Sequence, residues 1–511
     1  MQIEAHEPHH RAEPDLQDKG LSHNAVGLLG GVVLGVSSVA PAYALTATIG
    51  ILVAEAGSKM VVVIIAGFLP MFFAAYAYRE LNKVAPDCGT SFTWTTKAFG
   101  PYIGWMGGWA AVVATVIVLS NLAGVAVQFF YQFIGDLFGS DSLAGMWQNP
   151  VINVLTCLGF LAVATAISYR GITTTERIQF ILVGFQMTVL LAFAVVAIVK
   201  SGSSATGIPF SFEWFSPAGL TVSAFIAGLS GSIFAFWGWD TALTVNEESR
   251  DSDRTPGRAA LLCVVSILLT YLLVAVATQM YAGVGSEGLG LGNEDIEDNV
   301  FGALAEPILG GPLHLFLFLA VLASSAASLI TTFLPTSRTM LAMGTYKAFP
   351  KRFTTIHPRF MTPSFAVIAA GVGAAVFYSV LTFVSARVLT DTIYSLGIMI
   401  CFYYGLTAFG CIWFFRNELF ASASSVIFKL LFPLLGGLGL AAVFVITLRD
   451  SASPDYGSGA SIGGVGLVLI LGLGLILIGL VFMLIMRARQ PAFFRGETLR
   501  KDTPVLIVEE P

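Results

Sequence analysis

Charged side chains are scarce in this sequence, and their scarcity indicates the class of protein. Only 11% of the 511 residues are Asp, Glu, Lys or Arg, against roughly 25% in soluble domains, while 56% are hydrophobic. Long apolar runs recur from end to end, each close to the roughly 20 residues that cross a bilayer as a helix. The weak alternation typical of outer-membrane barrels is missing. We therefore predict an all-α polytopic protein of the cell membrane, in contact with the lipid bilayer.

Patterns typical of catalysis and of cofactor binding are also missing. The five cysteines form no CxxC pair, and the six histidines fall almost entirely outside the apolar runs. The sequence contains no GxxxxGK[ST] phosphate-binding loop and no recognisable Ser-His-Asp set. These absences argue against an enzyme, an ATP-driven pump and a nucleic-acid-binding protein. We expect no cofactor and no metal site, and we interpret the cysteines as free thiols.

Twelve apolar segments occupy most of the chain. A polar tail at residues 1–23, expected to be disordered, precedes them, and a second polar tail follows at residues 488–511. One transmembrane domain therefore covers residues 24–487. The expected spans are residues 25–55, 59–81, 102–134, 151–168, 176–199, 218–247, 258–283, 313–343, 364–385, 389–415, 427–448 and 462–486.

The basic residues between these segments predict which side of the membrane each loop faces. Of the 26 Lys and Arg residues, only Lys59, Lys200, Arg387 and Arg449 fall on one side, and all others fall on the opposite side. An excess of Lys and Arg marks the cytoplasmic side. Both termini are therefore expected in the cytoplasm, in agreement with an even number of spans.

Two of the expected spans are interrupted. The first contains Pro41, which removes an amide donor and clashes with the preceding turn, so this helix should break or kink before it. The sixth contains Gly238 and the carboxylate of Asp240 within a long apolar run. An ionisable group at that depth usually faces a cavity, a pathway or a ligand. Two matching breaks indicate a midplane substrate site, although two kinks in ordinary packing helices are the alternative.

Three stretches of sequence together resemble the amino acid–polyamine–organocation (APC) transporter superfamily. The first is FAFWGWDTALTVNEESRDSDRTPGRAAL at residues 234–261. The second comprises PDCGTSF at 86–92, FGP at 99–101 and GGW at 107–109; the third runs from Thr336-Ser337-Arg338 through Pro350 to Pro363. In this order the stretches cover about residues 24–415 and are specific for the superfamily.

This resemblance implies a LeuT-like fold with two inverted five-helix repeats, about residues 24–199 and 216–415, and two additional helices at about 427–487. It also implies a small amine-bearing substrate, usually an amino acid or a polyamine, held between spans one, three, six, eight and ten. Two positions depart from the family pattern. Gly35-Val36-Ser37 stands where many members have Gly-Ser-Gly, and Gln186 aligns with the lysine of many proton-coupled members.

A zwitterionic substrate needs an anion site and a cation site. Unwinding at 36–40 would leave amides that suit a carboxylate. Unwinding at 236–239 would expose carbonyls for an ammonium, and Asp240 would add a negative charge. The candidate substrate-binding residues are Val36, Ser37, Ser38, Ala40, Asn121, Phe234, Phe236, Trp237, Gly238, Trp239 and Asp240. The alternative role for Asp240 is an N-cap of the second half-helix.

Two further groups of residues suggest an ion site and a gate. Ser328, Thr331 and Thr332 are candidate Na⁺ ligands facing the first span; the alternative is helix packing by small residues. Glu247, Glu248 and Arg254 are candidates for a cytoplasmic gate; the alternative is a solvated helix end. Because Gln186 cannot titrate, we expect coupling to Na⁺ or transport without an ion, with H⁺ carried by Asp240 as the rival.

The combined features predict a secondary active transporter, a permease that moves an amino acid or related amine by alternating access. The alternatives are a polyamine or organic-amine carrier or exchanger, and a non-transporting substrate sensor of the same fold. An ion channel should show charged rings or a filter loop, and the sequence shows neither.

Overall fold

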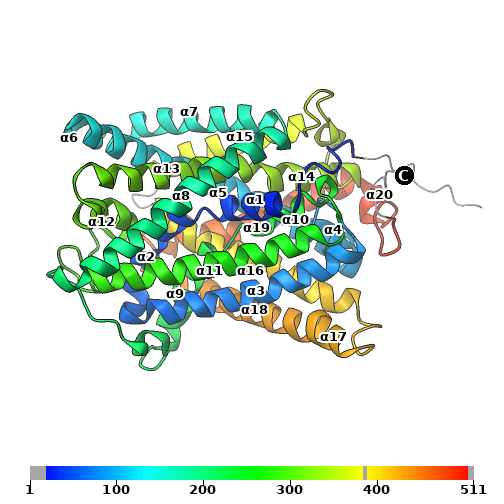
Figure 1. Cartoon of the computed structure of the whole chain (residues 1–511). Helices are drawn as coiled ribbons and strands as arrows, with labels where there is room; N and C mark the ends of the chain where they lie inside the picture. Colours follow the sequence, from blue (N-terminus) through cyan, green and yellow to red (C-terminus); the bar gives the residue numbers. More distant parts are fainter. Residues whose placement is uncertain (1–18, 384–387, 505–511) are drawn as a thin grey trace, which may run out of the picture.

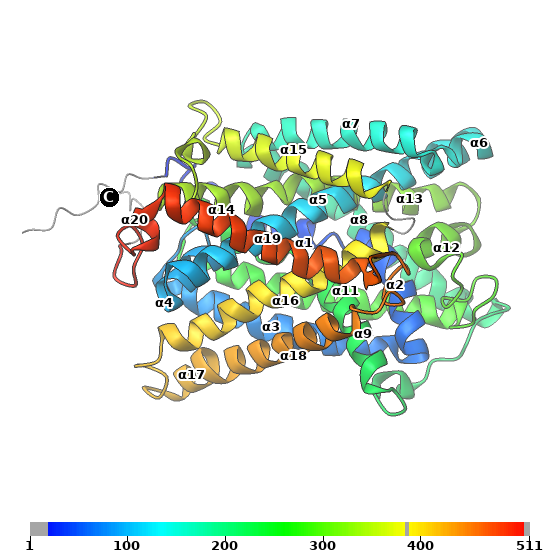
Figure 2. The same cartoon turned by 180° about the vertical axis from the view of Figure 1, so that it is seen from behind.

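The computed structural model of the chain describes residues 19–383 and 388–504, and its long helices run side by side along a common direction (Figures 1 and 2). The long helices are α1 (Leu28–Val39), α2 (Pro41–Ala56), α3 (Met60–Val84), α5 (Pro101–Phe138), α7 (Pro150–Tyr169), α8 (Ile172–Lys200), α9 (Val222–Ala235), α11 (Thr255–Ala282), α13 (His314–Thr331), α14 (Phe333–Thr345), α15 (Ser364–Leu381), α16 (Val388–Phe414), α18 (Phe432–Asp450) and α19 (Leu467–Arg489). Short elements are α4 (Ser91–Phe99), α6 (Asp141–Ala144), α10 (Thr241–Thr244), α12 (Val300–Leu309), α17 (Ala423–Ser425), α20 (Pro491–Phe494) and the antiparallel pair β1 (Ser461–Ile462) and β2 (Val465–Gly466).

The helices coincide with the apolar segments of the sequence. Each of the twelve expected spans contains a helix, and spans one, six and eight each contain two helices in succession. Among the described residues, ten stretches are long and apolar enough to cross a membrane; Leu28–Val84 counts as a single stretch, and α9 falls below the length limit. The helical fold class is therefore confirmed, and the number of crossings stays a prediction.

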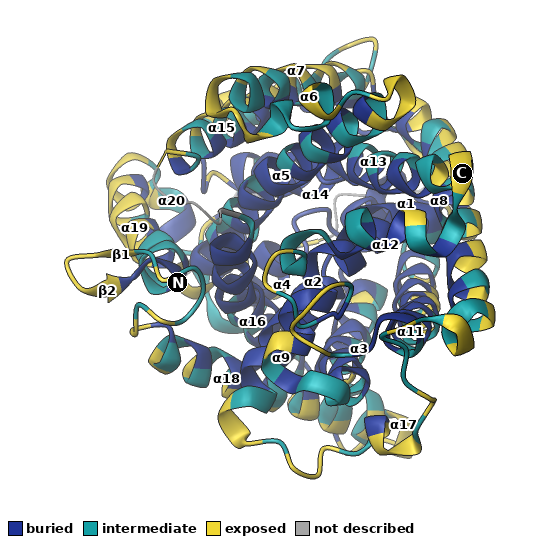
Figure 3. Cartoon of the chain, turned by 90° about the vertical axis from the view of Figure 1, so that its left-hand side faces the viewer, coloured by how far each residue is buried: buried dark blue, intermediate teal, exposed yellow. Residues whose placement is uncertain are grey.

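The outer surface of the bundle is apolar. Viewed end-on, buried residues fill the centre and exposed residues lie at the rim (Figure 3). Large apolar side chains are exposed along the rim helices, among them Val151 and Leu155 on α7 and Val372 and Val376 on α15. Buried Ser and Thr hydroxyls are common in the interior. A rim of apolar side chains around a core with polar groups suits a bundle surrounded by lipid.

The two ends of the bundle differ, and both expected tails are partly folded. We call the end that holds α4, α14 and α20 the cytoplasmic end, following the distribution of Lys and Arg (Figure 1). Lys19 is buried there, although it was expected in a disordered tail. After α19, Phe493 stacks on Phe92 with ring centroids 5.5 Å apart, and Thr498 Oγ1 donates to the carbonyl of Tyr346 at 2.6 Å. Residues 1–18 and 505–511 of the tails, and Arg387, lie outside the described residues.

Candidate functional site

The first span breaks at a single residue. Helix α1 ends at Val39, Ala40 has the left-handed conformation (φ 55°), and α2 begins at Pro41. Proline disfavours the α conformation of the residue before it, and it suits the first helical position because its missing N–H would have no partner there. The break expected before Pro41 is therefore present, at a cost of about 1–2 kcal/mol for left-handed alanine.

The extent of this break corrects the expected anion site. Val36, Ser37 and Ser38 lie within α1, where helical hydrogen bonds engage their amides, and even the Ala40 amide donates to the Val36 carbonyl at 3.1 Å. The amides of Val36–Ser38 are therefore not free for a carboxylate. Amides without helical partners belong instead to the first turn of α2, where Tyr43 N–H donates to Ser324 Oγ at 3.3 Å.

The sixth span breaks over residues 236–240, between α9 and α10. Gly238 has φ 113°, a conformation that favours glycine. Among the described residues no backbone amide donates to the carbonyls of Phe236 and Trp237, as expected for carbonyls that face an ammonium. A Cβ at position 238 would lie 2.9 Å from the carbonyl carbon of Ser38, so the two broken spans touch through their backbones.

Hydroxyl groups connect the two breaks to span eight. Thr241 Oγ1 donates to Ser38 Oγ at 2.7 Å, which joins α10 to α1. Ser328 Oγ donates to the Ser38 carbonyl at 2.8 Å, which joins α13 to the last turn of α1. The hydroxyls of Ser38 and Ser328 therefore bond protein groups at the junction of spans one, six and eight.

Asp240 is buried without a basic partner. Its residue surface is 6% exposed, and in the described part of the chain no basic side chain forms an ion pair with it. It precedes α10 but makes no capping hydrogen bond, so the capping alternative is not realised. The groups that interact with it electrostatically are the hydroxyls of Tyr78, Tyr403 and Tyr404, of which Tyr404 is its hydrogen-bond partner, and the thiol of Cys263. The Asp240 carboxylate is thus surrounded by neutral hydroxyl and thiol groups and not by cations.

The aromatic candidates on the sixth span divide into two groups. Phe236 packs on Phe68 and Tyr271 of the neighbouring helices α3 and α11, with centroid distances of 5.8 and 5.1 Å, as a packing residue would. Phe234 faces Tyr43 of α2, at 6.4 Å and edge-on. Phe234 therefore lies on the side of the sixth span that faces the break of the first.

The two tryptophans lie on either side of the glycine and contact α16. Trp239 packs between Tyr78 and Tyr404, with both centroid distances at 5.1 Å. Trp237 Nε1 donates a hydrogen bond to the hydroxyl of Tyr403. These contacts fix the turn around Gly238 against the tenth span.

Several elements at and around the breaks carry buried polar atoms whose hydrogen-bonding capacity is not filled. These atoms include Tyr43 Oη, Asn121 Nδ2, Ser230 Oγ, Trp239 Nε1 and Tyr404 Oη, from α2, α5, α9, the turn at 236–240 and α16. Tyr43 lies next to Asn121, whose Oδ1 accepts from Thr392 Oγ1 of α16 at 2.9 Å. Because the large majority of buried polar atoms in proteins are hydrogen-bonded, such a group calls for an explanation.

A glutamine lies beside the hydroxyls of the expected Na⁺ site. Ser37 Oγ donates to Gln179 Oε1 at 2.6 Å, and Gln179 Nε2 donates to the Ala327 carbonyl at 3.2 Å. Ser37 also lies 3.4 Å from Thr331 Oγ1, whereas Thr332 Oγ1 has no hydrogen-bond partner in the described chain. The amide of Gln179 thus bridges spans one, five and eight beside the candidate ion-site hydroxyls, and the Na⁺ site itself stays a prediction. Gln179 of span five hydrogen-bonds span one, whereas no hydrogen bond of the Gln186 side chain is present among the described residues.

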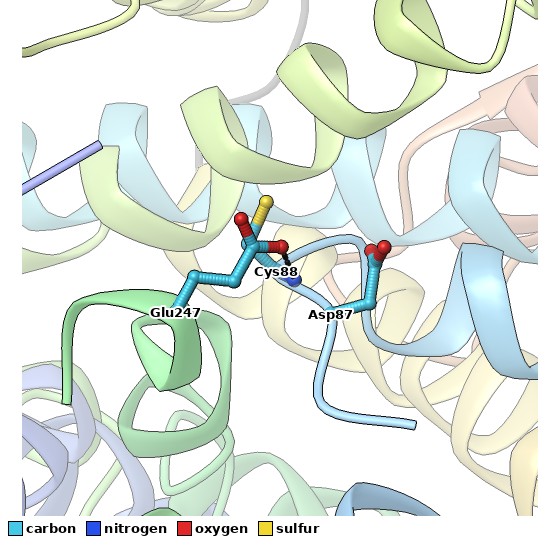
Figure 4. Close-up of side chains that lie close together, drawn as sticks. All are labelled: Asp87, Cys88 and Glu247. Atoms are coloured by element: carbon cyan, nitrogen blue, oxygen red, sulfur yellow. Dashed lines mark hydrogen bonds between the residues drawn. The ribbon is translucent and has the colours of Figure 1, made fainter. Parts of the chain in front are cut away.

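The two expected gate glutamates form ion pairs, but not with Arg254. Glu248 makes a two-pronged pair with Arg338 of α14, with both N–O distances at 3.0 Å. Glu247 Oε1 lies 2.5 Å from Lys19 Nζ and accepts from the Cys88 amide at 2.8 Å (Figure 4). Arg254 has a side chain that is 70% exposed and lies beside Asp253, so its expected pairing is corrected.

The fold and the paired breaks define a class: a multi-pass helical membrane protein of LeuT-like fold. The solved structure of MhsT in complex with L-phenylalanine matches 83% of this chain and 99% of its own chain, with a TM-score of 0.62 and 16% identity. The chain belongs to the amino acid permease family, whose family model matches residues 24–470. The sequence-based resemblance is thereby confirmed.

Relatives within reach of sequence comparison are distant. A vacuolar cationic amino acid transporter 2 of Arabidopsis thaliana is 26% identical over 59% of this chain and 46% of its own length. A branched-chain amino acid permease of Lactococcus lactis is 23% identical, over 62% and 67%. A low-affinity putrescine importer of Escherichia coli is 24% identical, over 59% and 63%. The chain therefore matches about half to two thirds of the length of these relatives.

Proposed function

We propose that this chain is a secondary transporter that moves an amino acid or a related amine, and that it has no enzymatic role. The observation that carries the proposal is a buried carboxylate, Asp240, without a basic partner in the described chain, at a break between two helices in the membrane core. Polar groups near the breaks, among them Tyr43 and Asn121, are incompletely hydrogen-bonded, so a polar ligand can bind them at little desolvation cost. Family membership supports the transport reaction.

Asp240 supports an amine as the common feature of the substrate. A buried carboxylate without a cation recognises an ammonium group, and the free carbonyls of Phe236 and Trp237 are suited to accept hydrogen bonds from it. The Ala42 amide at the start of α2 and the helix dipole there are the groups for a substrate carboxylate. An organic diamine is the second candidate, favoured by the putrescine importer among the relatives and by Asp240.

Uptake into proteoliposomes tests this proposal. A radiolabelled panel of cationic, branched-chain and aromatic amino acids and diamines should include at least one substrate, and Asp240→Asn should lose most of its uptake. Asp253→Asn, an exposed carboxylate at the cytoplasmic end, is the matched control and should transport normally. A panel without any substrate, or full uptake by folded Asp240→Asn, would contradict the proposal.

The Gln179 bridge supports transport without Na⁺. Its amide already satisfies Ser37 and the Ala327 carbonyl, so uptake at fixed pH should be equal in Na⁺ and choline buffers. Na⁺ stimulation that disappears in Thr331→Ala would reject this and restore the hydroxyl site. Uptake driven by a pH gradient alone, and lost in Asp240→Asn, would instead favour H⁺ coupling through Asp240.

A further inference from the structure

A lysine from the N-terminal segment is buried at the cytoplasmic end among acidic and aromatic groups. Lys19 Nζ lies 2.7 Å from Asp87 Oδ2, 2.5 Å from Glu247 Oε1 and 3.7 Å from Cys88 Sγ, and 5.4 Å from the ring centroid of Tyr346. The lysine side chain is 0% exposed. These five residues form the Lys19 cluster. A buried ammonium is costly unless it is paired, and here two carboxylates compensate its charge.

The carboxylate of Asp87 is held in place independently of Lys19. Its Oδ1 accepts from the Gly89 amide at 2.8 Å and from Thr93 Oγ1 at 2.7 Å, and its Oδ2 accepts from Tyr346 Oη at 2.6 Å. Burial opposes the charge, but Lys19 and these hydrogen bonds hold the pKa of Asp87 below its usual value. Asp87 therefore offers a fixed negative group to whichever cation approaches it.

Lys19 itself belongs with the sixth span. A short parallel bridge ties the N-terminal segment to the residues after α10: the Val26 amide donates to the Glu248 carbonyl at 3.0 Å, and the Arg250 amide donates to the Val26 carbonyl at 2.9 Å. Asp87 instead lies in the turn between α3 and α4, and α4 packs on α5 and α16. The Lys19–Asp87 pair therefore joins two separate parts of the cytoplasmic end. The Cys88–Glu247 hydrogen bond, which Figure 4 shows, joins the same two parts.

We propose that Lys19 is a tethered cation that holds the cytoplasmic end closed, and that it occupies a cation site formed by Asp87, Cys88 and Glu247. One ligand atom from each of these three residues lies within 4.8 Å of the others. When Lys19 withdraws, the two carboxylates and the thiol are the ligands for a soft divalent cation such as Cd²⁺. The site therefore takes either the lysine of its own chain or a metal ion.

The charges explain why the closed form depends on Lys19. Burial disfavours its charge, but the carboxylates of Asp87 and Glu247 outweigh that effect and hold the pKa of Lys19 well above its usual value. Lys19 is thus an ammonium throughout the physiological pH range. Without it, two carboxylates face each other in a buried place, and their repulsion favours separation of the two parts.

Cys88 provides a native reporter of this separation. It is 0% exposed, and burial followed by the charge of Glu247 raises the pKa of its thiol well above its usual value. A protonated, inaccessible thiol reacts slowly with alkylating reagents. Opening of the cluster should expose Cys88 to water and accelerate its alkylation.

The experiment follows N-ethylmaleimide labelling of the full chain in inside-out membrane vesicles, with the other four cysteines replaced by alanine. Lys19→Met should be labelled at least about tenfold faster than the parent, because the labelling rate follows the population of the open form. Lys501→Met is the matched control: Lys501 donates to the Phe414 carbonyl at the same end, 2.7 Å away, and labelling should stay within about twofold of the parent.

Two further variants separate the charge of Lys19 from its bulk. Asp87→Asn removes one carboxylate and leaves the size of every side chain almost unchanged. It should therefore also accelerate labelling, although less than Lys19→Met. In Lys19→Ala, Cd²⁺ should bind the vacated ligands and suppress labelling at concentrations at least about tenfold lower than in the parent chain. Asp87→Asn added to Lys19→Ala should weaken this protection.

Several results would overturn the proposal. One is labelling of folded, monodisperse Lys19→Met at the rate of the parent. Another is labelling of Asp87→Asn at the parent rate, which would mean that loss of lysine bulk alone exposes Cys88. Equal Cd²⁺ protection in Lys19→Ala and the parent would mean that Lys19 does not occupy the cation site. None of these measurements uses a substrate, so their failure would leave the proposed transport function standing.

Discussion

The middle of the molecule and its cytoplasmic end differ in how their buried charged groups are paired. At the cytoplasmic end, Lys19 pairs with Asp87 and Glu247, and Arg338 pairs with Glu248 at less than 2% exposure on either side. In the middle, the carboxylate of Asp240 has no basic partner in the described chain and interacts with the Tyr404 hydroxyl, while the buried indole N–H of Trp239 beside it has no hydrogen-bond acceptor.

This difference indicates that the cytoplasmic end holds two segments together, whereas the middle of the molecule binds a ligand. An ion pair between two segments holds them together only while its partners stay in contact, so charges at the cytoplasmic end favour one arrangement of the segments. Unpartnered polar groups at the breaks favour no arrangement of the protein by themselves and gain most from a ligand. Removal of one member of an ion pair at the cytoplasmic end should therefore affect stability, whereas removal of the unpaired carboxylate in the middle should affect ligand binding.

Removal of one partner of the Arg338–Glu248 pair should have the largest effect. Arg338→Met leaves Glu248 charged and buried without a cation, which typically costs about 3–5 kcal/mol. Thermal unfolding in detergent measures the loss. Arg254→Met, whose guanidinium is exposed, is the control and should stay within about 0.5 kcal/mol of the parent. Equal melting temperatures for the two variants would show that the pair does not support closure.

The backbone contact between the two breaks is the next target. Gly238→Ala places a Cβ 2.9 Å from the Ser38 carbonyl carbon, where no flexible side chain can move aside. Overpacking of this kind costs about 1–3 kcal/mol, and the positive φ adds to it. Gly184→Ala on the outer face of α8 meets no atom within 4 Å and is the control. The melting temperature should fall only in Gly238→Ala; an unchanged value would mean that the breaks are not tightly packed.

Asp240→Asn should separate binding from stability. Loss of a charged hydrogen bond to an ammonium group costs about 1.5–3 kcal/mol, which corresponds to roughly a tenfold to hundredfold loss of affinity. Without ligand, the melting temperature should stay equal or rise, because the variant removes a buried charge that has no cation. Thermal-shift titration with the best substrate measures both quantities. A destabilised Asp240→Asn with unchanged affinity would mean that Asp240, like Glu248, supports the stability of the fold and does not bind substrate.

The sequence predicts the features that depend on neighbouring residues. Pro41 and Gly238 locate the two breaks because proline and glycine act on the backbone at their own positions. Apolar runs locate the helices, and the acidic residue in the sixth span stands out against its surroundings. The sequence overestimates the first break, because nothing local shows that α1 stays helical through Ser38.

The contacts that the sequence does not predict join residues far apart in the chain. Lys19 is separated from Asp87 by 68 residues and from Glu247 by 228 residues. Arg254 is the nearer choice for Glu247 and Glu248 in sequence, but it points away from them in space. Gln179 carries no signal beyond being an amide in an apolar run, and the family resemblance draws attention instead to Gln186, two helical turns away, because it aligns with the lysine of proton-coupled members.

The smallest effect is expected at the hydroxyl contact between the breaks. Ser38→Ala removes the acceptor of the Thr241 hydroxyl, 2.7 Å away in the parent, and leaves the amide of residue 38 in its helical hydrogen bond. The loss should be about 0.5–1.5 kcal/mol, the usual net value of such a bond. A double-mutant cycle with Thr241→Val isolates the pair, and a coupling energy near 1 kcal/mol is expected. A coupling near zero would show that the Gly238 backbone contact alone joins the two breaks. The hydrogen bond from Ser328 to the Ser38 carbonyl is present in every variant of the cycle and cancels from the coupling energy.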